Sequence, residues 1–295
     1  MITIAAPAKI NLYLHVIGRR DDGYHLLDSL VAFADVGDEI YVDVGRHLSL
    51  DVIGPFADDL KNIKENLIIK AALLLARNAG IDAQAAIRVT KNLPVASGLG
   101  GGSMDAAATL KILLTHWNLS PKQEVLFEIA KQLGADVPVC LEGDACFIGG
   151  IGEILTRAPL LPDSWVVLVN PGVAVSTREV FKRRTGPFSV PSPFDQTPND
   201  TPALAALLLE RSNDLTDAAV GVAPVIDNAM KALANAEGSL IARLSGSGAT
   251  CFGLFELENE AQAAAKSLVQ EYPSWWIRAT PLLTSLQSRI DKSNR

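Results

Sequence analysis

Cysteine is scarce in this sequence, and no two cysteines have the spacing of a metal-binding pair. The chain of 295 residues contains three cysteines, Cys140, Cys146 and Cys251, and no Cys-x-x-Cys pair. The small, odd number argues against a disulfide framework, and the missing pairs argue against a structural zinc site. We therefore expect three buried, reduced thiols.

Long apolar runs are also missing. No stretch reaches the roughly 18 consecutive apolar residues that predict a membrane-spanning helix. The N-terminal segment is apolar but has no basic start, and Lys9 and Asn11 interrupt it, so we expect no signal peptide. These features predict a cytoplasmic protein that does not bind a membrane.

Positive charge is in deficit. Lys and Arg number 26 against 33 Asp and Glu, which gives a net charge of −7. Such a balance disfavours a protein that coats nucleic acid or an anionic membrane, while a local phosphate pocket stays compatible with it. The hydrophobic share of 48% is ordinary for a globular chain. The length corresponds to one large domain or two ordinary ones, at about 100–200 residues each.

Hydrophobic periodicity mixes strands and helices without strict alternation, which predicts an α+β fold. We place the domain boundary near residue 155, which gives domains 1–155 and 156–295, and we expect turns at 143–152 and a surface loop at 185–202. Capping boxes at Ser120 and Ser176 predict helix starts. The expected strands are 10–16, 39–44, 48–53, 85–90, 165–170, 242–245, 250–255 and 275–280. The expected helices are 66–78, 103–117, 121–134, a short helix carrying Phe181, 202–210, 222–236 and 258–271.

The most informative segment is the glycine-rich stretch 93–107. Gly98, Gly100, Gly101 and Gly102 stand directly before a predicted helix. Glycine permits close approach to the backbone, and a helix start offers unpaired N–H groups, so the pair suits a phosphate. The stretch is neither a Walker A loop, since no Lys follows the glycines, nor a dinucleotide fingerprint. A plain turn with Ser103 as helix N-cap is the alternative, and Asp105 would repel a phosphate placed too near.

This loop resembles the Pro-x-x-x-Gly-Leu-Gly-Ser-Ser-Ser-Ala phosphate loop of the galactokinase, homoserine kinase, mevalonate kinase and phosphomevalonate kinase (GHMP) superfamily. Segments 6–12 and 244–250 resemble two further motifs of that superfamily, in the same order. Finer segments resemble the branch that phosphorylates 4-diphosphocytidyl-2-C-methyl-D-erythritol. These are Pro7–Gly18, Asp22-Gly-Tyr-His25, Glu65–Ile69 and Gly134–Val139.

The resemblance implies a two-domain GHMP-kinase-like α+β architecture with the active site in the interdomain cleft. It implies transfer of the γ-phosphoryl group of ATP to the 2-hydroxyl of the methylerythritol unit, in non-mevalonate isoprenoid synthesis. ATP would enter as its Mg²⁺ complex, because the metal neutralises phosphate charge. The expected partner is the small-molecule substrate, a cytidine diphosphate methylerythritol, and we expect neither a permanent metal site nor a nucleic-acid partner.

Two residues match catalytic positions of the family. Asp136 matches the aspartate placed against the accepting hydroxyl, where a base orients the nucleophile. Lys9 matches the lysine paired with it, whose charge keeps the carboxylate ionised and stabilises developing charge. Without the resemblance, Asp136 would be an ordinary turn or cap aspartate and Lys9 a solvated strand residue.

The resemblance implies that ATP binds to the glycine loop and beside Asn66. Asn66 matches a position near the adenine, but it also suits a helix N-cap. Lys91 precedes the loop and suits either a nucleotide contact or a solvated surface position. The loop departs from the superfamily in that Ser103 alone keeps a hydroxyl and Met104 stands where Ser is frequent. The loop residues expected to bind ATP are Pro94, Val95, Ala96, Ser97, Gly98, Leu99, Gly100, Gly101, Gly102 and Ser103.

The substrate side matches five further positions. The family implies that Tyr24 stacks on cytosine, that His25 hydrogen-bonds it and that Phe181, with Thr177 before it, forms a second aromatic face. Asn11 matches a substrate contact near the reacting centre. Without the resemblance, Tyr24 would be a core residue, His25 a surface residue and Asn11 a polar, outward-facing strand residue.

A second glycine turn, with Gly246, Ser247 and Gly248, lies near the C-terminus. It suits a simple hairpin, and the resemblance implies that it lies close to the first glycine loop as supporting structure. Two other functions stay open: another small-molecule kinase of the superfamily, such as a homoserine or mevalonate-type kinase, and a nucleotide-binding protein without catalysis. Tyr24, His25 and Phe181 argue against the former, and the presence of both Lys9 and Asp136 argues against the latter.

Overall fold

The computed structural model describes residues 1–60 and 66–286, in which helices and strands mix without regular alternation. The α+β class expected from the sequence is therefore confirmed. Glu65, which opens one of the family-like segments, lies outside the described residues. Within the described ranges, no helix combines the length and the apolar character needed to cross a lipid bilayer. All three cysteines are buried free thiols, as expected.

Two compact units divide the chain. Unit 1 comprises Met1–Ala8, Gly37–Val95 and Gly100–Glu142, and unit 2 comprises Lys9–Val36, Ala96–Leu99 and Gly143–Arg295. The strands β1 (Ile2–Arg19) and β2 (His25–Asp43) supply residues to both. This division differs from a single boundary near residue 155, because each long strand packs partly in one unit and partly in the other.

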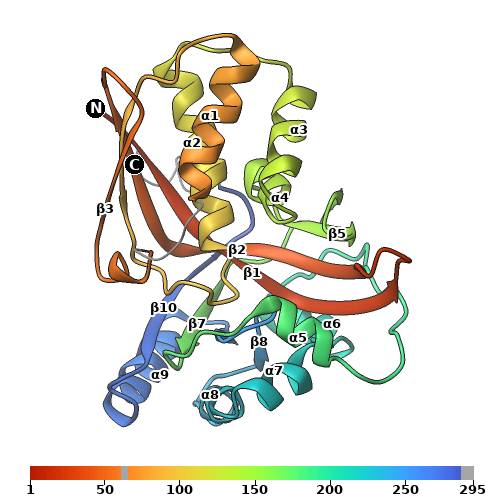
Figure 1. The fold of residues 1–295 in the computed structure, drawn as a ribbon. Helices are drawn as coiled ribbons and strands as arrows, with labels where there is room; N and C mark the ends of the chain where they lie inside the picture. Colours follow the sequence, from red (N-terminus) through yellow and green to blue (C-terminus); the bar gives the residue numbers. More distant parts are fainter. Residues whose placement is uncertain (61–65, 287–295) are drawn as a thin grey trace. The chain divides into compact units, whose positions relative to one another are not determined.

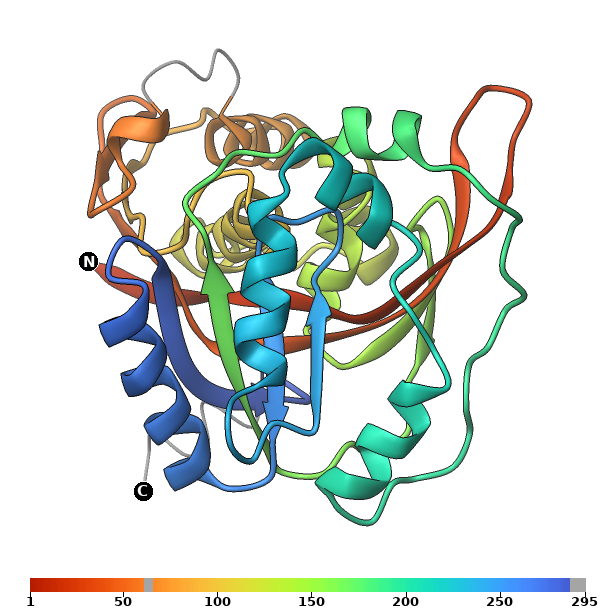
Figure 2. The same cartoon turned by 90° about the horizontal axis from the view of Figure 1, so that it is seen from below.

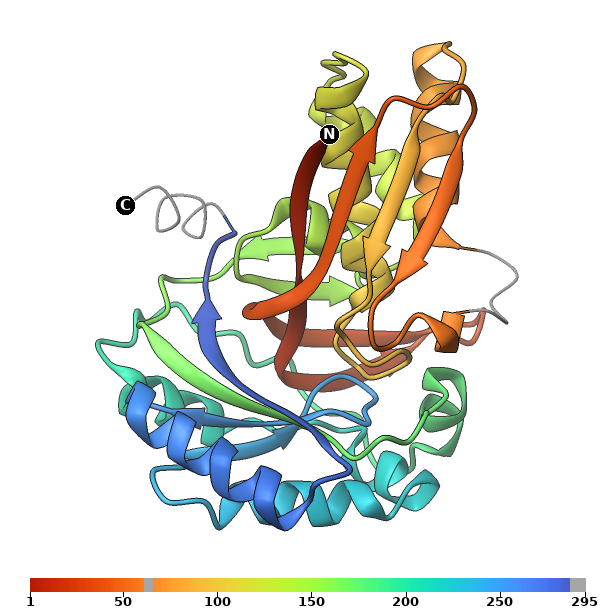
Figure 3. The same cartoon turned by 90° about the vertical axis from the view of Figure 1, so that its left-hand side faces the viewer.

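Unit 1 joins a small sheet to a group of helices (Figure 3). β4 (Ala86–Thr90) pairs parallel with β3 (Ser49–Ile53) and antiparallel with the end of β2. Alternate residues of β4 are buried, as expected for a sheet with one covered face. A short 3₁₀ helix spans Asp58–Leu60, and α1 and α2 lie side by side (Figure 1). The α-helices of the unit are α1 (Leu67–Ala79), α2 (Gly101–His116), α3 (Gln123–Leu133) and α4 (Val137–Glu142).

The helix starts in unit 1 only partly follow the sequence-based prediction. Asn66 caps α1 as expected, since its Oδ1 accepts from the Ile68 N–H at 2.9 Å. α2 begins at Gly101, so Ser103 lies in its first turn and the suggested N-cap role of Ser103 is wrong. The capping box at Ser120 is also wrong, because Lys122 has an extended backbone (φ −63°, ψ 149°) and α3 begins only after it. The short helix α4 was not predicted.

Unit 2 contains a larger antiparallel sheet with the strand order β6-β5-β2-β10-β7-β9-β8. β1 also pairs with β2. The central strand β7 sets the register, with Val167 opposite both Gly253 and Ala279. The strands are β5 (Cys146–Gly150), β6 (Ile154–Arg157), β7 (Ser164–Asn170), β8 (Ile241–Leu244), β9 (Cys251–Phe255) and β10 (Trp276–Leu283).

Helices α8 (Val225–Ala234) and α9 (Glu258–Glu271) lie along the strands of unit 2 (Figure 2). Their buried side chains form one core with β7 and β9, which includes Leu233, Leu268, Val169 and Phe255. The shorter helices are α5 (Thr177–Arg183), α6 (Thr201–Leu209) and α7 (Thr216–Val222). Ser176 caps α5 as predicted, with its side chain accepting from the Glu179 N–H at 3.4 Å.

Two elements of unit 2 correct the prediction. The segment 143–152, expected to form turns, contains strand β5, whose residues Cys146, Phe147 and Ile148 are buried and pair with β2. The single helix predicted at 222–236 is in fact α8, and the separate helix α7 precedes it. Ala223, between them, has an extended backbone (φ −140°, ψ 89°), which ends α7 before Pro224.

Candidate active site

Lys9 is a buried residue of β1 in unit 2. Its side chain is 4% exposed, and Nζ donates to Asn11 Oδ1 at 2.7 Å. Residues two apart on a strand project to the same face, which brings the two side chains together. The solvated lysine that a strand edge suggests is therefore wrong, and Lys9 is instead a buried charge with a defined acceptor.

The backbone of this strand is held by the first glycine loop. The Lys9 N–H donates to the Leu99 carbonyl at 2.8 Å, and the Asn11 N–H donates to Ser245 Oγ at 3.2 Å. Both N–H groups therefore donate to acceptors that do not belong to a neighbouring strand. The strand that carries Lys9 and Asn11 is consequently fixed to both glycine segments.

The two glycine segments contact each other directly. The Ser97 carbonyl accepts from the Thr250 N–H at 2.9 Å, and the Gly98 carbonyl accepts from Ser245 Oγ at 3.0 Å. A Cβ added at Gly98 would collide with the Ser245 carbonyl, and the φ of Gly98, +80°, is left-handed. The closeness of the second glycine turn to the first loop, which the resemblance implied, is confirmed.

The remainder of the loop begins α2 in unit 1. Gly100 is the N-cap with φ 63°, and Gly101, Gly102 and Ser103 form the first turn. The N–H groups of a first turn have no partner within their helix and carry partial positive charge. A Cβ at Gly102 would meet only Leu67, at 3.8 Å, so space remains beside the backbone there. This end of α2 fits a phosphate group. Pro94 and Val95 precede it in the same unit.

Lys91 lies beneath this helix start rather than at the surface. It is 3% exposed, and Nζ contacts Asp38 Oδ2 and, at 2.6 Å, Asp105 Oδ2. The other oxygen of Asp38 accepts from the N–H groups of Asn92 and Leu93, at 2.6 Å and 2.9 Å. The solvated position suggested for Lys91 is wrong. Asp105 is also buried and pairs with the Lys91 ammonium.

Burial and charge act differently on the pKa of Asp105 and the pKa of Lys91. Burial raises the pKa of Asp105 to about 7, and the opposing charge of Lys91 does not offset it. For Lys91, burial acts to lower the pKa, but the carboxylates of Asp105 and Asp38 outweigh it and the pKa is raised. The ammonium therefore stays charged at neutral pH and joins the start of α2 to the segment before the loop.

Asp136 stands in unit 1, half-buried, directly before α4. Its carbonyl accepts from the Cys140 N–H at 3.3 Å, which makes it the residue from which the helix begins. Pro138 is tolerated at the second helical position because a first-turn N–H needs no intrahelical acceptor. The carboxylate of Asp136 thus projects from a backbone that α4 fixes.

The residues predicted to bind cytosine lie in unit 2. His25 and Phe181 stack, with ring centroids 5.1 Å apart and an interplanar angle of 25°, whereas Tyr24 is 61% exposed. Thr177 Oγ1 lies 2.8 Å from Ser247 Oγ, which fixes the start of α5 to the second glycine turn. The structure thus brings His25 and Phe181 together and leaves the Tyr24 ring in solvent.

His25 is kept neutral by its surroundings. Burial lowers the pKa of His25, and the positive charges of Arg19 and Arg184 lower it further. A neutral imidazole presents one donor and one acceptor nitrogen, which suits hydrogen bonds to a nucleobase.

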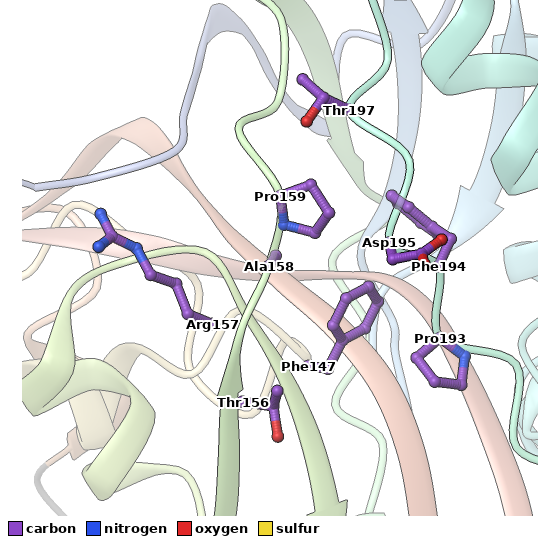
Figure 4. A pocket seen from close by; sticks show the side chains of 9 residues that line it. All are labelled: Phe147, Thr156, Arg157, Ala158, Pro159, Pro193, Phe194, Asp195 and Thr197. Carbon is purple, nitrogen blue, oxygen red and sulfur yellow. The ribbon is translucent and has the colours of Figure 1, made fainter.

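A separate groove of about 710 Å³ in unit 2 contains none of the predicted site residues. Figure 4 shows the side chains that line it. Among them, Phe147 and Phe194 meet edge to face, with ring centroids 5.2 Å apart. Its charged lining residues are Arg157 and Asp195. The residues that line this groove include no glycine and no buried lysine or arginine. Within residues 1–60 and 66–286, no group of three or more His, Cys, Asp or Glu side chains could hold a metal ion.

The structure adds three residues that the sequence did not single out. Ser29 Oγ accepts from Asn11 Nδ2 at 2.9 Å and donates to the Tyr13 carbonyl, and it is fully buried. Ser245 bridges the Asn11 N–H and the Gly98 carbonyl, and Asp38 holds Lys91. Ser245 stands in a recognisable motif, but no local pattern marks Ser29 or Asp38.

Models of protein families match both halves of the chain. The model of the GHMP kinases N terminal domain matches residues 66–144, and that of the GHMP kinases C terminal domain matches residues 198–274. The first range contains the loop, α2 and Asp136, and the second contains the second glycine turn.

Curated relatives are similar over nearly their whole length. A 4-diphosphocytidyl-2-C-methyl-D-erythritol kinase of Paramagnetospirillum magneticum is 51% identical over 96% of this chain and 99% of its own. The protein of the same name from Rhodospirillum rubrum is 47% identical over 95% of this chain and 92% of its own.

Solved structures share the fold. A crystal structure of 4-(cytidine 5'-diphospho)-2C-methyl-D-erythritol kinase superposes with a TM-score of 0.78 at 32% identity, covering 96% of this chain and 99% of that one. A homoserine kinase from Cytophaga hutchinsonii gives a TM-score of 0.74 at 18% identity, covering 96% and 95%, and shows the shared fold alone.

Proposed function

The chain belongs to the GHMP kinase family and, within it, to the 4-diphosphocytidyl-2-C-methyl-D-erythritol kinases, and we propose on that premise that it phosphorylates this substrate. The γ-phosphoryl group of ATP is transferred to the 2-hydroxyl of the methylerythritol unit. The product is the 2-phosphate, an intermediate of non-mevalonate isoprenoid biosynthesis.

One observation supports this function most strongly. The strand with Lys9 and Asn11, the first glycine loop and the second glycine turn are joined through Leu99, Ser245 and Gly98 by direct hydrogen bonds. A buried ammonium on a strand whose backbone is hydrogen-bonded to a glycine loop suits a reaction in which negative charge develops on phosphate oxygens. A plain turn requires no such cation.

Asp136 and Lys9 are the catalytic residues of the proposal. The Asp136 carboxylate orients the 2-hydroxyl and accepts its proton as the O–P bond forms. Lys9 donates hydrogen bonds to oxygen that gains negative charge during the transfer. Asn11 contacts the substrate beside Lys9. Phosphoryl transfer depends mainly on this kind of positioning and charge stabilisation.

The nucleotide side is formed by the start of α2 and the loop before it. Gly100, Gly101, Gly102 and Ser103 offer backbone N–H groups and one hydroxyl to phosphate, and Asn66 lies on the adenine side. Bound ATP, as its magnesium complex, supplies the phosphoryl group and the cation that neutralises phosphate charge. We propose that the metal enters with the nucleotide.

The cytidine side is formed by Tyr24, His25 and Phe181, with Thr177 at the start of the same helix as Phe181. Neutral His25 offers hydrogen bonds to the base edge, and the aromatic rings offer stacking surfaces. Stacking of a base on an aromatic ring is worth about 1–3 kcal/mol. These residues select the cytidylylated substrate over a simple sugar alcohol.

Three wider expectations accompany the proposal. We propose a division into halves 1–155 and 156–295, which the separate ranges of the two family models support. We also propose that the protein acts in the cytoplasm. Its net charge of −7 supports the further expectation that it does not bind nucleic acid.

Product analysis tests the function. The protein is incubated with Mg·ATP and 4-diphosphocytidyl-2-C-methyl-D-erythritol, and the products are followed by ³¹P NMR. The proposal expects ADP and a new phosphomonoester, with the diphosphate of the substrate intact. Turnover of homoserine or mevalonate instead would indicate another kinase of the family, and nucleotide binding without any turnover would indicate a non-catalytic protein.

A further inference from the structure

We infer that Ser29 is a positioning residue that orients the Asn11 carboxamide and, through it, the Lys9 ammonium. Ser29 is fully buried on β2 and touches the Asn11 side chain directly. The inference rests on the proposed function, because it assigns Lys9 a part in that reaction.

The direction of each hydrogen bond fixes the Asn11 amide. The Ser29 hydroxyl has one hydrogen, and the Tyr13 carbonyl, which can only accept, takes it. The remaining lone pairs of Ser29 Oγ therefore face Asn11 and require its NH₂ group, 2.9 Å away. This leaves Asn11 Oδ1 pointing to the opposite side, at 2.7 Å from Lys9 Nζ.

The reversed amide has no place in this network. Lys9 has three N–H donors and no acceptor, so an Asn11 NH₂ group turned toward it would set donor against donor. Asn11 and Lys9 are 2% and 4% exposed, so water has little access to repair the mismatch. Lys9 and Ser29 thus hold the Asn11 amide from its two ends, and both favour the same orientation.

The backbone of Asn11 is fixed independently of Ser29. Ser245 Oγ accepts from the Asn11 N–H at 3.2 Å and donates to the Gly98 carbonyl, while the Lys9 N–H donates to the Leu99 carbonyl. The freedom left to Asn11 is the rotation of its side-chain amide. Ser29 removes that freedom.

Loss of the Ser29 hydroxyl should affect the rate and not the binding of ATP. With alanine at position 29 the Asn11 NH₂ group loses its acceptor, so the amide is held at the Lys9 end alone and Oδ1 is no longer fixed opposite Nζ. We expect kcat to fall about tenfold, while KM for ATP changes less than twofold, because small displacements of groups at the reacting centre lower the rate. A Ser29→Thr variant keeps the hydroxyl and should retain most of the wild-type kcat.

A matched control separates this role from simple loss of a buried hydrogen bond. Ser164 on β7 is 2% exposed; its hydroxyl lies 3.1 Å from the Pro162 carbonyl and 2.9 Å from Thr201 Oγ1, away from Asn11. Ser164→Ala should lower the melting temperature as much as Ser29→Ala but leave kcat unchanged. Equal kcat in Ser29→Ala and Ser164→Ala, or a Ser29→Thr variant as slow as Ser29→Ala, would overturn the inference.

A second measurement does not depend on turnover. The side-chain NH₂ signal of Asn11, assigned through an Asn11→Ser variant, is followed in ¹⁵N-labelled protein. Hydrogen exchange of that NH₂ should be slow in the wild type and in Ser164→Ala, and at least tenfold faster in Ser29→Ala. Unchanged exchange in Ser29→Ala contradicts the inference. An inactive wild type with the expected exchange pattern would refute the proposed function and leave the orienting role standing.

Discussion

Lys9 and Tyr24 belong to the same β-hairpin, yet their surroundings differ sharply. Lys9 is 4% exposed, with Asn11 as the acceptor of its ammonium and the Leu99 carbonyl as the acceptor of its N–H, whereas Tyr24 is 61% exposed. We call the first region, with Lys9, Asn11, Ser29, Gly98 and Ser245, the reacting end. We call the second, with Tyr24, His25 and Phe181, the base end.

The difference follows from the demands of each task. Donors that stabilise developing charge act best when they are fixed before the reaction, because they then need no reorganisation. A nucleobase is held by stacking and a few hydrogen bonds. Exposed rings can move into position for these contacts when the base binds. The comparison therefore predicts that changes at the reacting end lower kcat and stability, while changes at the base end raise the KM of one substrate.

The largest effect is expected from the catalytic residues. Lys9→Met keeps the side-chain length and Asp136→Asn keeps the shape, but each removes a charge that the reaction uses. We expect kcat to fall about 10³-fold in each variant, within the range of general acid–base effects. Steady-state ADP release measures this.

The control is Lys231→Met, which removes an exposed lysine paired with Asp227 across one helical turn. It should keep wild-type kcat. A Lys9→Met enzyme that is folded by circular dichroism and turns over at near-normal rate would remove Lys9 from the mechanism.

The second effect concerns the contact between the glycine segments. Gly98→Ala places a Cβ against the Ser245 carbonyl and forces a left-handed φ of +80° on alanine. The backbone strain alone costs about 1–2 kcal/mol and the collision adds to it, so we expect a loss of unfolding free energy of about 3 kcal/mol with a raised KM for ATP. Urea denaturation measures the loss.

Gly221→Ala is the matched substitution outside the site. Nothing lies within 4 Å of its added Cβ, and it stands in helix α7. The substitution should stabilise the protein by about 0.5–1 kcal/mol. If Gly98→Ala and Gly221→Ala have the same unfolding free energy, the inference that the reacting end is tightly packed is wrong.

The third effect belongs to the base end. Tyr24→Ala and Phe181→Ala remove aromatic surface worth about 1–3 kcal/mol of base stacking. KM for the cytidylylated substrate should rise roughly tenfold or more, while KM for ATP stays within twofold. Tyr272→Ala, which removes a ring stacked on Trp275, should change neither KM. Equal rises in both KM values would contradict a cytosine clamp.

The smallest effect tests whether the triad under α2 titrates near neutral pH. The pKa of Asp105 is about 7 in the folded protein and about 4 when unfolded. Between these values the folded state binds more protons, so the unfolding free energy falls as pH rises. Asp105→Asn cannot titrate, and its stability relative to wild type should increase from pH 6 to pH 8 by on the order of 1 kcal/mol.

An exposed aspartate provides the comparison. Asp51 pairs with Arg88 at the surface, with both side chains 56% exposed. Asp51→Asn, measured in the same urea titrations, gives the pH profile of a surface aspartate. A flat profile for Asp105→Asn would mean that Asp105 does not change its charge in this range.

The sequence was enough for elements whose signals are local. Asn66 and Gly80 mark the ends of α1, and the helix lies where the pattern predicted it. Some short elements were missed, such as β5 with its two glycines and α4 with its proline, although the short strands β4, β8 and β9 were predicted. Pairing with β2 stabilises β5, and neither β5 nor α4 has enough periodic residues to be recognised alone.

The site divides in the same way. Lys9, Asp136 and the glycine loop stand in motifs, so their candidacy could be predicted from the sequence. Ser29 and Ser245 act on Asn11 across 18 and 234 residues of chain. A serine in a strand carries no signal of such a contact, because only the folded sheet decides which side chains meet.

The most direct test of the account compares one enzyme on two substrates. ADP release is measured with Mg·ATP and either 4-diphosphocytidyl-2-C-methyl-D-erythritol or methylerythritol 4-phosphate, which lacks the cytidine. The account predicts turnover of the cytidylylated compound and a kcat/KM at least 10³-fold lower for the other, because the base end has nothing to hold. Comparable kcat/KM values for the two compounds, or no turnover of either, would contradict it.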